Sequence, residues 1–478
     1  MEKFDLVVVG AGAAGLAAAQ VAAAMRRTVA LVERDRFGGE CTWNGCVPSK
    51  ALIEAARLRF DMERAPRFGV HPGEVRVDFP AVMRHVHDVI DRIARYEDAA
   101  HLSEAGVTTV VGRARLLDPG AVEVDGTRLA AGRVVIATGS RPAGPPIDGL
   151  AAVPHLTNET LFELQSLPAH LLVIGAGPIG LEMAQAFHRL GSRVTVLDVL
   201  ETLLPREDPD IAAAARAMLE GEGIRFMLGV RIQRASADGA VRRLHLAGGD
   251  QADTVEGDAL LVATGRRPTV DGLGLEAVGV RVDRGGVAVD DRLHTSVDGI
   301  LAAGDVTGIL PFTHAAAYQG RLAARNALGG RHRADYRVVP WIIFTDPEIA
   351  HVGMTEPEAR QHRGDVHVAR LPFTAVDRAV VRREPRGLIK VITAGKPIIG
   401  HRGGGGEIIG AHLIGPGAGE LLHEFVVSMQ ARTFSGRVAQ AIHAYPSMSM
   451  GVQQAVAQLF PAGRAVAGEM RTELEAEG

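Results

Sequence analysis

The chain of 478 residues contains two cysteines, Cys41 and Cys46, with four residues between them. A thiol pair at this spacing, on a turn leading into a helix, can close a disulfide where the backbone is irregular, and Gly45 eases such irregularity. A nearby helix start favours the thiolate, which attacks disulfides and binds soft metal ions. The alternatives are two buried structural cysteines or half of a zinc site, and for zinc no nearby His or third Cys completes the tetrahedron. We therefore predict a redox pair and no resident metal.

An apolar strand, a glycine-rich turn and an Ala-rich helix follow one another over residues 5–24. Such glycines let the backbone approach a pyrophosphate, which rests on the amide groups and positive dipole end of the helix. The next strand, at 28–32, is followed by an acid placed to accept hydrogen bonds from a ribose diol. The residues expected to contact this first nucleotide are Gly10, Gly12, Ala14, Gly15 and Glu33.

The same order of elements is repeated at residues 171–198, with the acid at the same spacing from the turn. Two copies predict two dinucleotides of different kinds. An acid at the second site favours NADH, because a carboxylate repels the 2'-phosphate of NADPH. Arg193 and Arg206 lie near in sequence and keep NADPH possible, and a solvated residue at a strand end is the alternative for the acid. The expected contact residues are Gly175, Gly177, Gly180 and Asp198.

Each unit also contains a buried strand that ends in Ala-Thr-Gly, at 134–139 and at 260–265. A further apolar strand, at 300–303, ends in Gly304 and Asp305, where the glycine leaves room for a ligand to pass close. Each could be a simple strand-to-turn junction. The candidate ligand contacts here are Thr138, Gly139, Gly265 and Asp305.

Composition and charge exclude several function classes. Hydrophobic residues make up 47% and charged residues 23%, values of a globular protein whose length predicts two or three domains. A net charge of -4 gives no field that would attract nucleic acid or an anionic membrane. No long apolar stretch predicts a membrane span, the first residues have no leader pattern, and two cysteines suggest a reducing compartment, so we expect an unprocessed cytoplasmic protein.

Together these motifs resemble the class I pyridine nucleotide-disulfide oxidoreductases, the family of dihydrolipoamide dehydrogenase, glutathione reductase and mercuric reductase. The resemblance covers nearly the whole chain, and its most specific part is GGECTWNGCVPSK at 38–50. It also rests on RRP at 266–268, AGDV at 303–306 and FTDPE at 344–348.

The resemblance implies an α/β fold with two Rossmann-like domains, for FAD and NAD(P), and a C-terminal α+β dimerisation domain. The expected boundaries are 1–150 and 270–335 for the FAD part, 151–269 for the NAD(P) part and 336–478 for the interface part. In the C-terminal part, strands near 387–392 and 407–414 and a helix near 419–430 suit an antiparallel sheet with helices on one side. We read residues 401–406 as a hairpin loop.

The resemblance also implies an electron path from NAD(P)H through FAD to the disulfide of Cys41 and Cys46. Cys46 would be the sulfur nearest the flavin, and Cys41 the interchange thiol that faces the substrate. Lys50 and Glu182 match the family's ion pair beside the flavin, and Asp305 would hold the ribityl chain.

The chain departs from this pattern in its C-terminal part. Family members that reduce disulfides take a His-Pro dipeptide and a Glu from the partner subunit, whereas Tyr445 and Met450 stand at these places here. His443, two positions early, is read as structural, with a role as acid or base as the alternative. Because a tyrosine titrates near about 10 and shuttles protons poorly at neutral pH, efficient dihydrolipoamide turnover is not expected.

A tyrosine in this region resembles mercuric reductases, although the vicinal cysteines that end those proteins have no match after Cys46. We therefore predict a homodimeric, mercuric-reductase-like enzyme whose acceptor is a metal ion or a small molecule such as a disulfide, a quinone or oxygen. A dihydrolipoamide dehydrogenase or other low-molecular-weight disulfide reductase is one alternative. A flavoprotein that serves as an electron carrier or scaffold within a complex is another.

Overall fold

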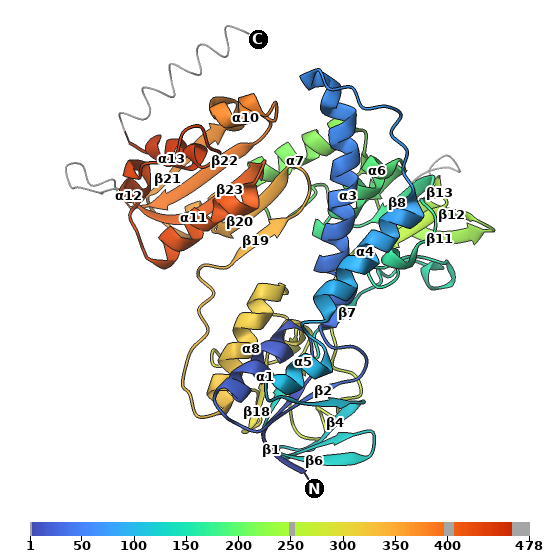
Figure 1. Cartoon of the computed structure of the whole chain (residues 1–478), viewed down its shortest axis with the longest axis vertical. Helices are drawn as coiled ribbons and strands as arrows, with labels where there is room; N and C mark the ends of the chain where they lie inside the picture. Colours follow the sequence, from blue (N-terminus) through green and yellow to red (C-terminus); the bar gives the residue numbers. More distant parts are fainter. Residues whose placement is uncertain (1, 248–253, 396–405, 461–478) are drawn as a thin grey trace.

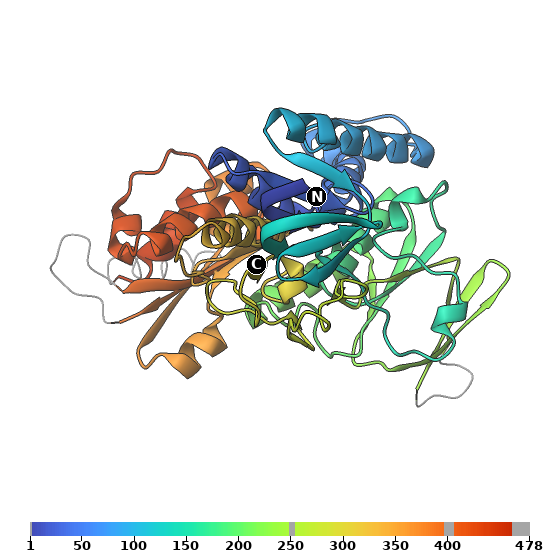
Figure 2. The same ribbon diagram turned by 90° about the horizontal axis from the view of Figure 1, so that it is seen from below.

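The computed structural model describes residues 2–247, 254–395 and 406–460. Three lobes are visible in Figure 1: the first nucleotide unit at the bottom, the second at the upper right and the C-terminal sheet at the upper left. Seen from below in Figure 2, the C-terminal part and the second unit extend to opposite sides of the first. Of the hairpin loop predicted at 401–406, residues 401–405 lie outside the described residues.

Helices and strands occur together throughout the described chain. The α-helices are α1 (Ala13–Ala24), α2 (Gly39–Trp43), α3 (Cys46–Arg64), α4 (Phe79–Ala94), α5 (Ala99–Glu104), α6 (Pro178–Leu190), α7 (Pro209–Glu222), α8 (Thr313–Ala327), α9 (Glu356–His362), α10 (Asp377–Val381), α11 (Ala418–Gln430), α12 (Ser435–Gln440) and α13 (Met450–Ala457). The strands of the first sheet are β1 (Glu2–Val9), β2 (Val29–Glu33), β3 (Thr108–Val111), β4 (Ala114–Asp118), β5 (Ala121–Val124), β6 (Thr127–Ile136) and β18 (Ile300–Ala302).

The first sheet has the order β3-β2-β1-β6-β5-β4, and its central strands are buried Val- and Leu-rich runs that pair in parallel. The ten-residue strand β6 pairs with two different strands along one of its edges. Its first half pairs with β5, and its second half, Val134–Ile136, pairs in parallel with β18. The strand that carries Asp305 at its end is therefore part of the first sheet, although some 160 residues separate it from β6 in the chain.

Helix α8 follows β18 and packs along α1, as the two helices lie side by side in Figure 1. Small residues permit this close approach, since a Cβ on Gly320 would overlap the backbone of Ala14. The methyl group of Ala14 in turn would lie 3.0 Å from a Cβ on Gly304. Ala14, which the sequence suggested as a nucleotide contact, is buried and brings the Asp305 loop close to the first turn.

The second unit repeats the central design with a smaller parallel sheet, in the order β10-β9-β8-β14. Its strands are β8 (His170–Ile174), β9 (Arg193–Leu197), β10 (Arg225–Met227) and β14 (Ala259–Val262). An antiparallel sheet of β11 (Ile232–Asp238), β12 (Val241–Leu246) and β13 (Thr254–Gly257) is attached to it.

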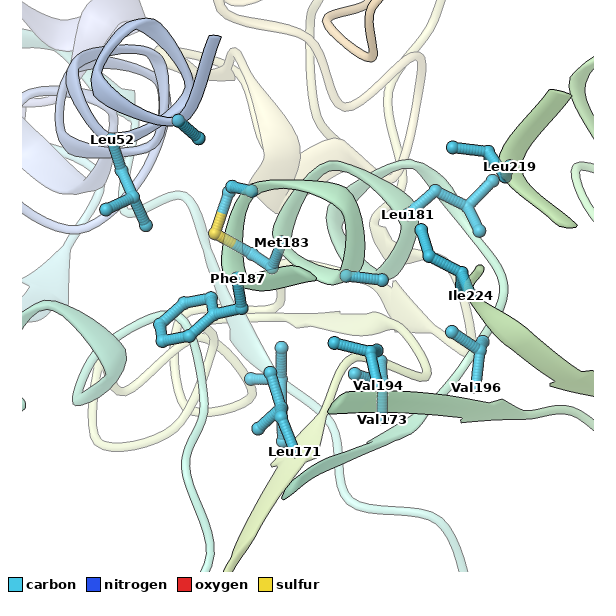
Figure 3. Close-up of a cluster of buried hydrophobic side chains, with 14 of the residues drawn as sticks. Leu52, Leu171, Val173, Leu181, Met183, Phe187, Val194, Val196, Leu219 and Ile224 are labelled. Atoms are coloured by element: carbon cyan, nitrogen blue, oxygen red, sulfur yellow. The ribbon is translucent and has the colours of Figure 1, made fainter. Parts of the chain in front are cut away.

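The core of the second unit lies between α6 and this parallel sheet. In Figure 3, Phe187 of α6 lies near Leu171 of β8, while Met183 of the same helix points toward Leu52, which approaches from α3 of the first unit. Each of these four side chains is at most 1% exposed. Their burial removes apolar surface from water and also joins the two units, because α3 and α6 share one core.

The chain crosses between the two units twice, and the two crossing segments pair with each other. They are β7 (Ser140–Pro142) and β15 (Arg266–Pro268), which are antiparallel and directly follow the two Ala-Thr-Gly motifs. A short hairpin, β16 (Val282–Asp283) and β17 (Gly286–Val287), lies between β15 and β18.

The C-terminal part is an antiparallel sheet in the order β19-β20-β23-β22-β21. Its strands are β19 (Pro340–Ile343), β20 (Glu348–Gly353), β21 (Val366–Pro372), β22 (Leu388–Ala394) and β23 (Glu407–Gly415). Alternate residues of β22 face opposite sides: Ile389 and Val391 pack into the core under α11 and α13, whereas Ile392 packs with α9. The antiparallel sheet is as predicted. The prediction that helices cover only one side of it is wrong, because α9 and the start of α7 cover the other face.

A buried polar cluster joins that other face to the second unit. The ammonium of Lys390, 2% exposed, donates to Asp208 at 2.7 Å and to Asp210 at 2.8 Å at the start of α7. His351 stacks on Trp341 with ring centroids 3.5 Å apart, and its Nδ1 lies 3.2 Å from the Glu207 carboxylate. Each charge is paired, as burial requires, so the cluster fixes the C-terminal sheet on the second unit.

Within the part of the chain that the structure describes, no helix is long and apolar enough to cross a membrane.

Candidate functional site

Both glycine turns are built in the same way. The first glycines, Gly10 and Gly175, have φ of +102° and +113°, in the region that side chains rarely adopt. The third glycines, Gly15 and Gly180, lie so close to the preceding turn that a Cβ on either would overlap the carbonyl oxygen of the first. These four glycines are therefore required for the turn and for helix packing.

The middle glycines have a different reason to lack a side chain. A Cβ on Gly177 would meet nothing within 4 Å, and one on Gly12 would meet only the Cα of Gly39, at 3.8 Å. Both residues precede a helix start, at α1 and α6, where free N–H groups and the helix dipole favour an anion. The open backbone at each turn fits the pyrophosphate of a dinucleotide.

The two predicted acids hold the same place relative to these turns. Glu33 accepts a hydrogen bond from the Ala11 N–H at 2.8 Å, and Asp198 accepts one from the Ala176 N–H at 2.7 Å. A carboxylate has about four acceptor sites, so capacity for ribose hydroxyls remains. Each acid is thereby fixed beside the turn where the sequence placed it.

Arg193 and Arg206, the two arginines near Asp198 in sequence that could have bound a 2'-phosphate, contact other residues. Arg193 bonds to the ring of His170 at 2.9 Å, and Arg206 lies 5.7 Å from the ring centroid of Trp341. Neither arginine is paired with Asp198 in these contacts.

The two sulfurs lie at consecutive helices of the first unit. Cys46 is the first residue of α3, as the sequence suggested, but Cys41 lies within the short helix α2 rather than on a turn. Both are free thiols, Cys41 half-buried and Cys46 exposed. A third residue, Thr313, has its hydroxyl oxygen 3.3 Å from the sulfur of Cys41 and 3.5 Å from that of Cys46.

The pair is electrostatically unequal. A hydrogen bond from the Cys41 thiol lowers the pKa of Cys46 to about 6, with Thr313 and the charge of Lys50 acting in the same direction against burial and Glu182. The same hydrogen bond and burial raise the pKa of Cys41. Two helix starts, those of α3 and α8, also converge here. At neutral pH the arrangement supports one thiolate, on Cys46, beside one thiol.

Lys50 and Glu182 form the ion pair that the resemblance implied, and each comes from a different unit. The Lys50 ammonium donates to Glu182 at 2.9 Å, and the other oxygen of the 7% exposed Glu182 accepts from the Phe344 N–H at 2.9 Å. Lys50 also lies 4.3 Å from the centroid of the Phe344 ring. One turn of helix separates Lys50 from Cys46, so its charge acts on that sulfur.

Asp305 is held at the crossing between the units. It accepts from the Ser140 hydroxyl at 2.6 Å and lies 3.9 Å from Arg266, which also pairs with Glu40 next to Cys41. Thr138 donates its hydroxyl to the Thr269 carbonyl at 2.6 Å, so this side chain has a structural bond here. Gly139 and Gly265 have positive φ and open space where a Cβ would be.

Comparison with known families agrees with this geometry. Residues 4–320 match the family described as pyridine nucleotide-disulphide oxidoreductase, and residues 339–456 match the dimerisation domain of the same family. The chain belongs to this family. The oxidoreductase is accordingly an FAD-dependent enzyme that uses NAD(P)H, and the open glycine turns and fixed acids fit these two dinucleotides.

Relatives of known name extend over nearly the whole oxidoreductase. A mercuric reductase of Streptomyces lividans is 40% identical over 468 residues, covering 96% of each chain. A dihydrolipoyl dehydrogenase of Thermus scotoductus is 35% identical over 464 residues, covering 96% of this chain and 98% of its own.

Solved structures give the same result. LpdA from Mycobacterium tuberculosis has a TM-score of 0.86 at 32% identity, covering 96% of this chain and all of its own. A Cu(II) complex of the HOCl-induced flavoprotein disulfide reductase RclA from Escherichia coli has a TM-score of 0.83 at 30% identity, covering 94% and 98%.

The C-terminal candidates of the oxidoreductase differ from each other. Both ring nitrogens of His443 are engaged, Nε2 with Glu424 and Nδ1 with the Ala441 carbonyl, each at 3.0 Å. Tyr445 is 71% exposed, and its bond to Asp377 raises the pKa of the phenol. Neither residue contacts Cys41 or Cys46 within the described chain, and the glutamate that holds a histidine here is Glu424, which the sequence did not suggest.

Sequence reasoning missed Thr313, Arg266 as a partner of Glu40, and Phe344 as a partner of Glu182. Glu40 lies inside the cysteine motif, and Arg266 and Phe344 begin motifs that the sequence analysis had noted. These three residues could therefore have been suggested as site residues from the sequence. Thr313 is 267 positions from Cys46, and no spacing or composition signal points to it.

Proposed function

We propose that this oxidoreductase uses NADH to reduce a soft divalent metal ion, of which Hg(II) is the type, at the thiol pair of Cys41 and Cys46. The observation that carries the proposal is a pair of free sulfurs, Cys41 and Cys46, within reach of one hydroxyl, together with a tyrosine where a disulfide reductase has its imidazole. Thiolates are the preferred ligands of soft cations.

The reaction balances without a proton for a leaving thiol. NADH and the dication give NAD⁺, one proton and the zero-valent metal. A disulfide substrate needs a proton at its leaving sulfur near neutral pH, and the phenol of Tyr445, with its raised pKa, supplies this poorly. The lack of an imidazole at position 445 therefore handicaps a disulfide substrate more than a metal ion.

The predicted glycines, acids and ion pair each have a role in this proposal. The glycine turns and Glu33 and Asp198 bind the two dinucleotides, while Lys50 and Glu182 hold a fixed charge beside the sulfurs. When bound, FAD supplies the two-electron carrier between NADH and the sulfur pair. Asp198 supports NADH as the donor, since Arg193 and Arg206 are engaged with other residues.

The names of relatives support the acceptor class. Mercuric reductases of four organisms, Bacillus cereus among them, are similar to this chain, and the RclA structure is described as a Cu(II) complex. Dihydrolipoyl dehydrogenases are similar to this chain at comparable identity. We separate the two acceptor classes by position 445, where this chain has a tyrosine in place of the histidine expected of a disulfide reductase.

We propose a homodimer as the catalytic unit, supported by the matched dimerisation domain and by exposed apolar side chains on its face, such as Phe434 at 52% and Ile442 at 100%. The domain boundaries at 150, 269 and 335 are part of this proposal, and so is a cytoplasmic location, which rests on the two-cysteine content. Analytical ultracentrifugation tests the dimer directly.

Substrate-dependent NADH oxidation tests the acceptor. The purified yellow protein is assayed with Hg(II) in excess thiol, with lipoamide, with other small disulfides and with quinones. We expect the highest kcat/KM for Hg(II), its loss in Cys41→Ser and Cys46→Ser, and a fall in Tyr445→Phe. Lipoamide turnover that exceeds Hg(II) turnover, survives Tyr445→Phe and collapses in His443→Ala would overturn both the acceptor and the structural role of His443.

A further inference from the structure

Thr313 is the one residue whose hydroxyl reaches both sulfurs in the described structure, at 3.3 Å to Cys41 and 3.5 Å to Cys46. It comes from α8, an element that otherwise packs on α1 and carries none of the predicted site residues. Its position is fixed because it is the first residue of α8, and its neighbour Phe312 stacks on Trp341 with centroids 5.5 Å apart.

A hydroxyl has a single hydrogen, so it can donate to one sulfur at a time. The sulfur that is negatively charged is the stronger acceptor, because charge-assisted hydrogen bonds are roughly twice as strong as neutral ones. Both sulfurs are within donation range of the same oxygen, and rotation about the Cβ–Oγ1 bond alone redirects the hydrogen. No heavy atom has to move.

We propose that the Thr313 hydroxyl is a shared hydrogen-bond donor that stabilises negative charge on whichever of the two sulfurs carries it. When Cys46 is the thiolate of the reduced pair, Thr313 donates to Cys46, and Cys41 donates its own thiol hydrogen to the same sulfur. When the Cys41 proton crosses to Cys46, the charge moves to Cys41 and the Thr313 hydrogen turns toward it. Proton and charge balance within the pair.

Other charges near the sulfurs do not share this property. Lys50 from α3 lowers and Glu182 from α6 raises the pKa of Cys46, whereas the Thr313 hydrogen bond lowers the pKa of both sulfurs. The starts of α3 and α8 are fixed dipoles that cannot turn. Thr313 is therefore the group suited to follow the charge during interchange, and it is a catalytic residue because it touches the reacting sulfurs.

This inference rests on the proposal that Cys41 and Cys46 are the redox pair, and it holds for any acceptor. The chain has two cysteines, so each single replacement leaves one thiol and each titration can be assigned. The pH at which the long-wavelength thiolate-to-flavin absorbance of the NADH-reduced holoenzyme is half lost reports Cys46. The pH profile of iodoacetamide alkylation in a Cys46→Ala background reports Cys41.

We expect Thr313→Val and Thr313→Ala to move both midpoints upward by about one pH unit, equivalent to a tenfold change in proton affinity. Thr313→Ser keeps the hydroxyl and should stay within about 0.3 unit of the parent. Thr313 is exposed and its oxygen does not cap α8, so unchanged flavin content should accompany these shifts.

A shift of only one midpoint would overturn sharing, and a shift of neither would overturn any role of Thr313 as donor. A merely structural role would lower flavin content or thermal stability in Val and Ala without moving either midpoint. Failure of the redox pair itself is recognised separately, because the NADH-reduced parent would then show no long-wavelength absorbance or Cys46→Ser would leave that absorbance in place.

Discussion

The two nucleotide units share one backbone design and differ in the segment that comes after the acid. After Glu33 the chain enters α2 and α3, which carry both sulfurs, whereas after Asp198 it passes to α7 and the buried cluster beneath the C-terminal sheet. The glycine turns thus decide where a dinucleotide lies. The chemistry depends on the residues between the second strand and the next long helix, which differ between the units.

The third glycines are the sharpest test of this comparison, and the largest effects are expected there. In Gly15→Ala the added methyl overlaps the Gly10 carbonyl, so the protein should retain little flavin, with affinity reduced by at least about 100-fold, or about 2.7 kcal/mol. Gly180→Ala meets the matching Gly175 carbonyl and should keep its flavin while losing reduction by NADH. Flavin absorbance and anaerobic stopped-flow reduction separate the two, and equal flavin loss in both variants would contradict independent units.

The ion pair between the units should give the next largest effect. Glu182→Gln and Lys50→Met each remove half of a fixed charge pair beside Cys46, and we expect the rate of NADH-dependent reduction to fall about 100-fold. The control is Arg57→Met, which removes a surface pair with Asp61 on the same helix and should change the rate less than about twofold. Equal effects in control and test variants would argue against a special role.

Neutralising each acid in turn should show which glycine turn binds which dinucleotide. In Asp198→Asn the negative charge that repels a 2'-phosphate is lost, so the ratio of kcat/KM for NADPH to that for NADH should rise about tenfold. Glu33→Gln, the matched change in the first unit, should weaken flavin binding and leave this ratio unchanged. A ratio that responds to Glu33 instead would reverse the assignment of the two turns.

Acid should destabilise the C-terminal sheet, in which His412 is buried on β23. Burial, with His351 nearby, lowers the pKa of His412 from 6.5 to about 4, so between these values the unfolded chain binds a proton that the folded chain does not. Stability should therefore fall with decreasing pH, by about 1.6 kcal/mol from pH 6.5 to 5.

Urea unfolding at both pH values measures this slope. His412→Gln keeps a donor for the Met354 carbonyl and should show a flatter dependence, while replacement of the exposed His71 should leave the slope as it is. A slope unchanged in His412→Gln would remove His412 from the explanation.

The smallest effect is expected at His443. Because both of its ring nitrogens are engaged with Glu424 and Ala441, His443→Ala should change turnover with the best acceptor by less than about twofold. Steady-state kinetics at pH 7 suffices, and a loss above tenfold would show that the imidazole takes part in proton transfer.

Features set by local sequence could be predicted, and contacts set by packing could not. The glycine turns, both acids and the start of α3 at Cys46 depend on neighbouring residues, and the structure agrees with each. The pairing of Lys50 with Glu182, 132 positions apart, came from family resemblance. Thr313 and Glu424 gave no signal, because their contacts exist only once α8 and α11 have packed. The helix at Cys41 was missed because five residues carry too little pattern.

Strand β18 has a consequence for synthesis on the ribosome. The second unit is continuous and can complete its parallel sheet once β14 has emerged, whereas the flavin-side sheet waits for residues 300–302 and then for α8 to cover α1. The nascent chain therefore carries a finished nicotinamide-binding unit before the isoalloxazine side can close. If FAD binds at this sheet as proposed, its uptake is a late event, after α8 at residues 313–327 of the 478-residue chain has been made.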